Sequence, residues 1–567
     1  MMRSLQLALC SLLVAGCGGG TGSLVVVTVD SNAPLADVAS LRCTATAGGQ
    51  TKPFSVLLAV HTFPPTHSFS IEVSPEISGV LSVHVDALSS TGATVGSDDG
   101  QTTIVAGASA TIALELGGGG GMDLGTGDGG DGGGADAAGC ATSATCADST
   151  PICASSTCRA CASASDDDQC QIHNVATPIC DPVAGACRAC KTHSECPAGV
   201  CASDGSCVPV SNIAYVNSGA AGCPSTGTHD GLSPATPFCD LPPAVAGTQP
   251  FILVHDGLYT PVTVARAATI VGPGIAGISN YATIQPPGGA SVALTFAATT
   301  SVTLTIDGLN FIGSVVCTGG AAQTLVVKNS QVTSAPLNAF GVLAGNCNID
   351  LIANDIVNNT AGGVKLGTGT AHLLNNRISD NRVVATDGTS GWGVFDNDPG
   401  NLTLESNYIS GNQSGGVFIE AGAWSLINNY LVVNFGNAGA ILNSPGGTFR
   451  FNTVVGNPEG IECNGGNVAI ESSIIWHNPM AGGQTFNGGC MRTNVVVGSD
   501  QTAFAGDVAL DPSFILGGEY KLDPTSALNT ACCVDKVPMA VGFPDHDFFG
   551  NHRPLGAAFD IGAHELK

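Results

Sequence analysis

The sequence predicts a mostly β protein whose C-terminal half is a parallel β-solenoid, and three observations favour that class. The stretch from Asn329 to Asn478 repeats with steps of 25, 22, 31, 22, 23 and 21 residues, and such a period indicates stacked repeats. Each row contains short β-prone runs separated by Gly and Asn, without room for a helix of about ten residues. Leucine-rich repeats share this period, but their leucine framework is missing. One row is therefore expected to form one coil.

Two polar positions recur in every row, an apolar position precedes the start of every row, and an aliphatic position follows the start in the last six rows. The rows begin at Asn329, Asn354, Asn376, Asn407, Asn429, Asn452 and Ser473. The second polar positions are Ser334, Asn359, Asn381, Asn412, Asn434, Asn457 and Asn478. The aliphatic residues two places after the start are Ile356, Ile378, Ile409, Leu431, Val454 and Ile475. The apolar residues three places before the start are Val326, Leu351, Leu373, Leu404, Leu426, Phe449 and Ile470. Successive coils stack about 4.8 Å apart, which predicts inward apolar columns and hydrogen-bonded asparagine ladders at the bends.

These rows resemble the right-handed β-helix of the pectin-lyase-like superfamily, whose coils carry a similar asparagine ladder. A second resemblance lies at the C-terminus, where the phrases Tyr520-Lys-Leu-Asp-Pro, Asp547-Phe-Phe-Gly and Asp560-Ile-Gly-Ala-His-Glu565 are similar to the end of the choice-of-anchor Q group. The resemblance implies a β-helix on a surface anchor. It implies no particular activity, because one fold supports many functions.

Composition restricts the partners of the chain. It has 567 residues, 17 Lys plus Arg and a formal charge of −27. A chain this acidic repels nucleic acid and anionic lipid surfaces. A neutral glycan, a metal cation or a basic protein remains open as a partner.

Residues 1–17 are expected to be a lipoprotein signal peptide. Arg3 provides the positive end, Leu5 to Val14 the apolar core, and Val14-Ala-Gly-Cys17 resembles a bacterial lipobox. The resemblance implies a diacylglycerol on Cys17 after cleavage, and Gly18 favours the outer membrane of the cell envelope. The alternative is an ordinary signal peptide with an incidental cysteine.

The remaining chain divides by composition. Residues 24–116 alternate like the strands of an immunoglobulin-like β-sandwich, and residues 117–139 form a Gly/Asp-rich flexible linker that cannot bury a core. Residues 211–567 contain the β-helix with terminal caps, and the apolar piece Pro243-Ala-Val-Ala is expected to cover its open end.

Residues 140–207 contain twelve cysteines. Two Cys-x-x-Cys pairs would suit a four-thiolate zinc site in a cytosolic protein. Behind an export signal, an even number of cysteines in a segment with few large apolar residues instead predicts six disulfides. Further expected bridges join Cys223 to Cys239, Cys317 to Cys347, and Cys463 to Cys490, whereas the adjacent Cys532 and Cys533 are not expected to bond to each other.

Few residues suggest catalysis. The step of 31 residues is expected to insert Val383–Gly400 as a loop with Trp392 and several acids. If the β-helix is an enzyme, Asp396, Asp398 and Glu420 are the candidate acids, with Lys365 or Arg382 as the base. A polysaccharide lyase of this kind would use Ca²⁺, but otherwise no cofactor is expected. The preferred expectation is that these acids are scattered and solvated and that Trp392 packs down on the coil.

The sequence therefore favours a membrane-anchored bacterial surface lipoprotein. Its β-helix is expected to serve as a non-catalytic module that binds an extracellular glycan or a cell-surface protein, or supports adhesion. The alternative is a polysaccharide lyase or glycoside hydrolase working on the outer face. At the C-terminus, Arg553 is expected to pair with Asp560 and fix the cap, with the nearby histidines exposed.

Overall fold

The computed structural model describes most of the chain after residue 141 and the strands before it. The described N-terminal ranges are 8–10, 23–31, 35–36, 38–47, 50–57, 62–63, 67–73, 79–89, 94–104 and 109–116. Residues 142–566 are described except for 148–149, 155–156, 224–228, 275–280, 290, 321, 336–338, 384–387, 399, 479–485, 500–503, 516–518 and 541–542. Cys17 and the expected linker at 117–139 lie outside the described residues.

Two four-stranded sheets in the N-terminal region share one apolar core. The first has the order β1-β7-β2-β10, with β1 (Ala8–Cys10), β2 (Ser23–Ser31), β7 (His67–Val73) and β10 (Ser109–Leu116). The second has the order β5-β4-β8-β9, with β4 (Val38–Ala47), β5 (Gln50–Leu57), β8 (Gly79–Ser89) and β9 (Thr94–Ile104). A short pair joins β3 (Leu35–Ala36) to β6 (Thr62–Phe63).

The core of these sheets follows from their alternating sequences. Val25, Val27 and Val29 of β2 and Val83 and Val85 of β8 are all buried. Cys43 lies in the same core as a free thiol, and burial raises its pKa to about 12. β1 is an edge strand within the expected signal peptide, and the β7–β2 and β2–β10 pairs do not involve it.

Residues 142–207 form small disulfide-bonded units. Their helices are α1 (Asp167–His173) and the 3-10 turns η1 (Ser143–Thr145), η2 (Ala164–Asp166) and η3 (His193–Glu195). Two hairpins pair β11 (Ile152–Ala154) with β12 (Thr157–Arg159) and β13 (Ile179–Asp181) with β14 (Ala186–Arg188). The disulfides are Cys146–Cys158, Cys161–Cys180, Cys170–Cys187, Cys190–Cys201 and Cys196–Cys207, and Cys153 is disulfide-bonded too. The predicted disulfide-rich character is therefore confirmed.

The last disulfide unit packs against the first coils of the solenoid. Val200 and Val208 share a buried cluster with Tyr215 and Val271. Beside this cluster, the ring Nε2 of His193 lies 3.0 Å from a carboxylate oxygen of Asp307, and Cys201 donates its backbone N–H to Nδ1 of the same ring. The tautomer with hydrogen on Nε2 satisfies both contacts. This contact fixes the end of the disulfide-rich segment on the solenoid.

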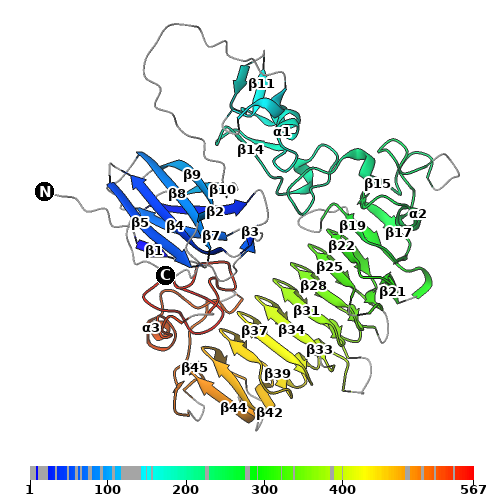
Figure 1. Ribbon diagram of the computed structural model, residues 1–567. Helices are drawn as coiled ribbons and strands as arrows, with labels where there is room; N and C mark the ends of the chain where they lie inside the picture. Colours follow the sequence, from blue (N-terminus) through cyan, green and yellow to red (C-terminus); the bar gives the residue numbers. More distant parts are fainter. Residues whose placement is uncertain are drawn as a thin grey trace, which may run out of the picture.

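Three walls of short parallel strands build the solenoid, in about nine coils (Figure 1). Wall A comprises β18 (Val262–Val264), β21 (Val292–Phe296), β24 (Ser314–Cys317), β27 (Val342–Ala344), β30 (Val364–Leu366), β33 (Trp392–Asp396), β36 (Gly415–Ile419), β39 (Ala438–Leu442) and the start of β42 (Glu459–Glu471). Wall B comprises β15 (Ile213–Val216), β16 (Phe251–Val254), β19 (Ala268–Val271), β22 (Thr303–Asp307), β25 (Thr324–Lys328), β28 (Asn348–Ile352), β31 (Thr370–Leu374), β34 (Asn401–Glu405), β37 (Ala423–Ile427), β40 (Thr448–Arg450) and the end of β42. The last strand, β44 (Phe486–Thr493), pairs with both parts of β42.

Wall C forms a separate twelve-stranded parallel sheet. Its strands are β17 (Gly257–Tyr259), β20 (Ala282–Ile284), β23 (Asn310–Ile312), β26 (Gln331–Thr333), β29 (Asp355–Val357), β32 (Arg377–Ser379), β35 (Tyr408–Ser410), β38 (Tyr430–Val432), β41 (Thr453–Val455), β43 (Ile474–Trp476), β45 (Val495–Val496) and β46 (Asp507–Val508). The short helix α2 (Leu241–Ala246) packs Leu241, Ala244 and Val245 on the core at the N-terminal end. The 3-10 turns η4 (Val210–Asn212) and η5 (Pro287–Gly289) lie near these first coils.

The predicted columns and ladders are present from the second row onward. The aliphatic column of wall C pairs in register from Ile356 through Ile378, Ile409, Leu431 and Val454 to Ile475. In the first row the sequence reading is off by one residue. Val327 rather than Val326 lies in the wall B column, and Ser330 rather than Asn329 donates its backbone N–H to the ladder at Asn354.

Within each ladder, an asparagine bonds both to the next ladder residue and to the backbone, and the first ladder ends with Asn452 bonded to the hydroxyl of Ser473. Asn429 donates its backbone N–H and its Nδ2 to Oδ1 of Asn452, at 2.8 and 3.0 Å. Its Nδ2 also donates to the carbonyl of Leu404, and its Oδ1 accepts from Asn407. The same pattern links Asn354, Asn376 and Asn407, and a second ladder runs from Asn359 through Asn381, Asn412, Asn434 and Asn457 to Asn478. The buried amides are therefore satisfied by the stack itself.

The insertion predicted at Val383–Gly400 is only partly a loop. Residues 392–396 form β33, which pairs with β30 and β36, so the extra length of this row lies before Trp392. The sequence Trp-Gly-Val-Phe-Asp aligns with Gly-Gly-Val-Phe-Ile of β36, which explains why it continues the wall. The expected bridges Cys223–Cys239, Cys317–Cys347 and Cys463–Cys490 are present.

The C-terminal segment turns back and covers the outer side of wall C near the end of the solenoid (Figure 1). Ala563 lies in one buried cluster with Tyr430, Val432 and Val455, and its N–H donates to the hydroxyl of Thr453. This segment includes α3 (Ala527–Cys532) and a disulfide between Cys532 and Cys533. The expectation that these two cysteines would not bond was wrong. Both cysteines are fully buried in the cluster that also contains Phe559 and Ile561.

Candidate functional site

The outward face of wall A gathers the residues suggested as functional. Phe395 and Phe418 occupy one outward column, in which β30 contributes Lys365 and β39 contributes Ile441. The two phenyl rings stack with centroids 4.9 Å apart and planes at 13°. The ammonium of Lys365 lies 5.6 Å from the Phe395 ring and 5.7 Å from the Phe340 ring. We call Phe340, Trp392, Phe395 and Phe418 the aromatic strip, and Lys365 is the cation at its edge.

Trp392 anchors this strip to the coil. Its side chain is only 1% exposed, its ring centroid lies 5.3 Å from that of Phe418, and its Nε1–H donates to the carbonyl of Gly388. Trp392 thus packs down on the coil, as expected. Phe418 is half-buried and Phe395 is 3% exposed, so the accessible part of the strip is the edge of Phe418 with Lys365 and Phe340.

A chain of polar side chains borders the strip where the wall A strands end. Asn443 donates to a carboxylate oxygen of Glu420 at 2.6 Å, and Asn464 donates to Asn443 at 3.0 Å and to Glu462 at 2.9 Å. Glu420 and Asn464 are exposed, and Asn443 and Glu462 are half-buried. We call Glu420, Asn443, Asn464 and Glu462 the polar border. It orients carboxylate and amide groups toward solvent in fixed positions.

Asp396 lies on the other side of the wall from these residues. Its register partners are Leu366 of β30 and Ile419 of β36, both of which belong to the solenoid core, and its side chain is 1% exposed. Burial raises the pKa of this carboxyl to about 7; the Asp398 backbone N–H acts against that shift and the Asp398 charge adds to it. The expectation that Asp396 is solvated was therefore wrong, because the period-two alternation of β33 directs it inward.

The candidate catalytic residues are not brought together. Asp396 lies inside the solenoid, Asp398 is half-buried in the bend after β33, and Glu420 is exposed and bonded to Asn443. Lys365 contacts two rings, and in the described part of the chain it forms no ion pair. Hydrolysis of a glycosidic bond needs two carboxyl groups facing one substrate across roughly 5–10 Å. The wall separates Asp396 from Glu420 and removes that possibility for this pair.

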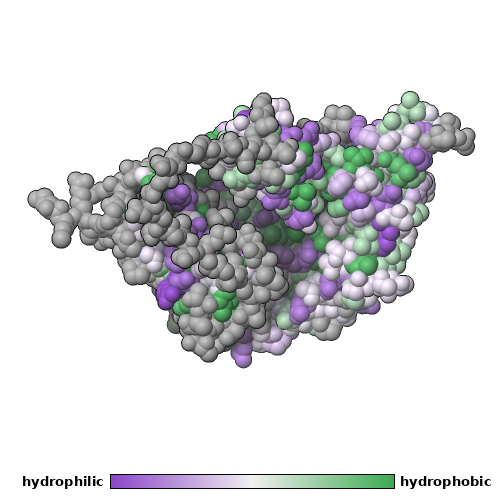
Figure 2. Space-filling view, turned by 45° about the horizontal axis from the view of Figure 1, so that its top comes forward, coloured by the Kyte–Doolittle hydropathy of each residue, from purple (hydrophilic) through white to green (hydrophobic). Residues whose placement is uncertain are grey.

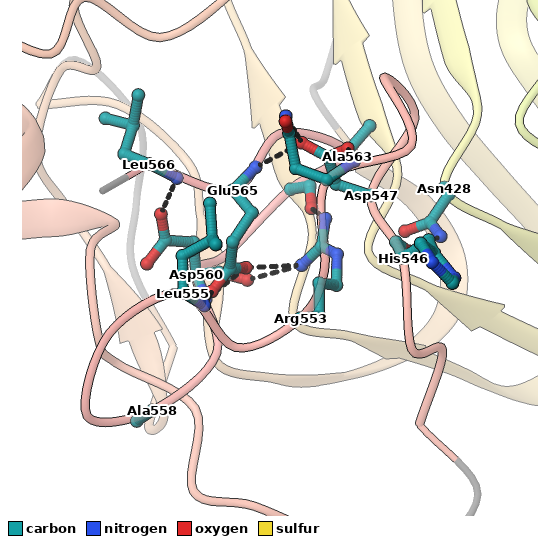
Figure 3. A network of polar contacts seen from close by, with 12 residues as sticks. Asn428, His546, Asp547, Arg553, Leu555, Ala558, Asp560, Ala563, Glu565 and Leu566 are labelled. Carbon is teal, nitrogen blue, oxygen red and sulfur yellow. Dashed lines mark hydrogen bonds and ion pairs between the residues drawn. The ribbon is translucent and has the colours of Figure 1, made fainter. Parts of the chain in front are cut away.

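A second polar network lies within the C-terminal segment (Figure 3). The guanidinium of Arg553 is fully buried, donates to the carbonyls of Asp560 and Gly562, and forms an ion pair of 3.1 Å with Glu565, which is also fully buried. The predicted pairing with the Asp560 carboxylate was wrong: that carboxylate accepts the backbone N–H groups of Asp535 and Leu566. Asp547 accepts from the backbone of Phe549, Asn551 and Glu565.

This network holds the turned-back C-terminal segment in place. The Arg553 guanidinium lies 4.7 Å from the ring of Phe451, and burial raises the pKa of the Glu565 carboxyl while the Arg553 charge opposes that shift. His564 is half-buried rather than exposed, and burial lowers its pKa to about 4. Apart from Nε of Arg553, which has no hydrogen-bond partner among the described residues, these polar groups bond to one another or to the backbone. The network therefore stabilises the turned-back segment. We call residues 545–566 the clasp.

Two groups of cysteines have the spacing of metal ligands. Sulfur atoms of Cys190, Cys196 and Cys207 lie close together, as do Cys223, His229 and Cys239. Every cysteine in these groups is in a disulfide, so no thiolate is free to bind a metal there. In the described residues, no helix is long and apolar enough to cross a membrane.

Comparison with known proteins supports the fold. Residues 296–454 match the family model described as the right-handed beta helix region, which spans the coils with the regular asparagine ladders. No curated protein and no solved structure matches the chain. The match identifies the class of the solenoid as a right-handed β-helix and does not specify a substrate.

Sequence reasoning missed three features of this molecule. The inward direction of Asp396 could have been found by aligning β33 with β36, because the aspartate then falls opposite Ile419. The Arg553–Glu565 pair could not have been found, since the irregular chain between them offers no period. The contact between His193 and Asp307 joins residues 114 apart and left no local signal.

Proposed function

We propose that this protein is a bacterial surface lipoprotein, anchored through lipid on Cys17, whose β-helix binds an extracellular glycan without cleaving it. The observation that carries the binding part is the outward face of wall A, where the aromatic strip lies beside the polar border. Sugar rings present apolar faces and rings of hydroxyl groups, and pockets that hold them combine aromatic edges with amides and carboxylates. Both kinds of group lie here on a rigid wall of backbone-paired strands.

The absence of turnover follows from the placement of the acids. Asp396, whose pKa is raised to about 7 by burial, is enclosed in the core, where a polysaccharide cannot reach it. Glu420 on the outer face accepts a hydrogen bond from Asn443, and the wall separates it from Asp396. The two carboxylates of the polar border, Glu420 and Glu462, are bonded to the amides of Asn443 and Asn464, which favours a role in binding over the acid and base pair of a hydrolase or a Ca²⁺ site. The lyase or hydrolase alternative is therefore not favoured.

Charge restricts the class of glycan. The protein carries a formal charge of −27, and the polar border adds two carboxylates at the proposed contact. Lys365, at the edge of the aromatic strip, offers one positive charge on this face. Neutral glycans therefore fit this face better than polyuronates, which would meet like charge.

A glycan array with matched variants tests the proposal. The wild-type chain, purified without its lipid, is expected to bind one group of neutral glycans, and the double change Glu420→Ala with Glu462→Ala should weaken that binding about tenfold or more. Thr403→Ala, on the outward side of wall B, serves as the control and should bind as the wild type does. Equal binding by all three proteins would place the ligand elsewhere, and an array with no hit would contradict the proposal.

A further inference from the structure

One core column of the solenoid contains a single ionisable residue. In wall A this column runs through Leu366, Asp396, Ile419, Leu442 and Cys463, which pair in register on successive strands. All five are buried, and the four others belong to the main apolar core. Asp396 therefore occupies a position that the fold fills with an apolar side chain in every neighbouring coil.

The described residues around Asp396 provide few hydrogen bonds and no opposite charge for an ionised carboxylate. Among the described residues its Oδ1 has no hydrogen-bond partner, and its carboxyl accepts from the backbone N–H of Asp398. The charge of Asp398 also acts on the Asp396 carboxyl, and it repels a carboxylate there because both charges are negative. The strands that face Asp396 across the core contribute the buried apolar side chains Ala371, Leu373, Leu402, Leu404, Trp424 and Leu426.

The other ionisable residues near this coil point away from the core. Lys365 and Glu420, on or just after the two adjacent strands of wall A, face outward. His372 and Glu405, on the opposite strands of wall B, alternate with the inward leucines and are half-exposed. None of these four groups shares the interior with Asp396, so an ionised carboxylate there would be unpaired in an apolar environment, which is costly.

We propose that Asp396 is a proton-sensitive latch: the closed coil at β33 holds it as the neutral acid, and loss of its proton to solvent opens that coil. Opening brings the carboxylate to water, and closing requires that a proton be taken up again. The latch is coupled to the outer face, because the next residue along the strand, Phe395, stacks on Phe418 and contacts Lys365. A rotation of β33 that exposes Asp396 must displace Phe395.

The direction of the pH effect follows from linkage. Burial raises the pKa of Asp396 to about 7 in the closed coil, whereas the exposed group has the ordinary value of 3.8. A raised pKa for an acid means that the closed coil binds the proton more tightly, so closure is favoured at low pH and weakens as pH rises from about 4 to about 7. With these values, the opening equilibrium constant increases roughly a hundredfold between pH 5 and pH 8.

Amide hydrogen exchange of the full chain at pH 5, 6, 7 and 8 tests the latch, after correction for the intrinsic exchange rate at each pH. Peptides that contain β33 should show the increase in opening, while peptides that contain β37 should show little. In Asp396→Leu, which restores the apolar column, opening at β33 should no longer depend on pH. Asp396→Asn, which cannot ionise, should lose the pH dependence as well and provides a second variant if leucine overpacks the coil.

Asp398→Asn is the matched control, because it removes a nearby carboxylate outside the core. It should keep most of the pH dependence of the wild type. A wild-type β33 whose opening is constant from pH 5 to pH 8 would overturn the proposal. Equal pH dependence in the wild type and in both Asp396 variants would overturn it too, because another group would then control the coil. Neither readout involves a glycan, so the latch stands or falls independently of the proposed binding function.

Discussion

At the scale of single residues, the fold depends on buried polar groups whose partners are supplied by the next coil. Asn429 illustrates this dependence, because its amide both donates to Asn452 and accepts from Asn407 while it bonds the backbone at Leu404. Replacing one ladder member removes several hydrogen bonds and leaves the amides above and below partly unpaired. An unpaired buried polar group costs more than a hydrogen bond contributes.

We expect Asn429→Leu to lower the free energy of unfolding by roughly 1–3 kcal/mol. Thr403→Ala, a half-exposed change on wall B, should cost less than about 0.5 kcal/mol. Chemical denaturation of both variants and the wild type measures the difference. Equal stabilities for Asn429→Leu and Thr403→Ala would contradict the prediction that the ladder hydrogen bonds stabilise the fold.

Arg553 provides a second prediction at this scale. Arg553→Met leaves the fully buried Glu565 without its cation, and breaking a buried pair in this way costs about 3–5 kcal/mol. Since burial raises the pKa of Glu565, the carboxyl can neutralise itself at low pH, and the loss should be larger at pH 8 than at pH 5. Arg450→Met breaks the partly exposed pair with Glu471 and should cost at most about 1 kcal/mol. A loss for Arg553→Met that is equal at both pH values would contradict this account.

At the scale of elements, the bends between walls require left-handed backbone just before each ladder residue. Asn428, Asn358 and Asp380 have positive φ there, and Asn and Asp tolerate that conformation. Val433 also adopts it, with φ of 52°, although a β-branched residue is strained in this region. Its side chain is 37% exposed, so little packing offsets the strain.

Val433→Asn is therefore expected to stabilise the protein by about 0.5–1 kcal/mol, because asparagine relieves the backbone strain. The matched control is Val332→Asn, which places the same amide in the core and should destabilise the protein. Thermal unfolding compares the three proteins. A lower melting temperature for Val433→Asn than for the wild type would contradict this prediction, because the packing of Val433 would then outweigh its backbone strain.

The sequence allowed prediction of elements wherever a period was present. The ladders and columns from Asn354 onward follow from spacing alone, since stacking places equal positions above one another. The first row slipped by one residue because Asn329 and Ser330 are both polar, and only the pairing of Val327 with Leu351 decides between them. Asp396 was expected in a solvated loop because residues 383–400 were assigned to an insertion, whereas residues 392–396 form β33 and direct its side chain inward. The clasp has no period, so the choice between Asp560 and Glu565 as the partner of Arg553 required the structure.

At the scale of the whole molecule, rigid parts follow one another along the chain. The disulfide-bonded segment ends on the first coils through Val200, Val208 and the His193–Asp307 contact, and the clasp closes on the last coils. The proposed lipid anchor at Cys17 lies at the opposite end of the chain from the clasp. We expect Cys17→Ser to move the protein from the membrane fraction to the soluble envelope fraction, because it removes the site of lipid attachment. Retention of the Cys17→Ser protein in the membrane fraction would contradict the proposal that lipid on Cys17 anchors the chain.

The central claim is that the β-helix binds a neutral glycan without cleaving it, and one assay on the same samples tests both halves. The full chain without lipid is incubated with a panel of neutral and acidic polysaccharides, and bound protein and newly formed reducing ends are measured together. We predict protein bound to at least one neutral polysaccharide and no increase in reducing ends above a protein-free sample. Reducing ends that accumulate with the wild type and not with Glu420→Gln would contradict the claim and identify an enzyme.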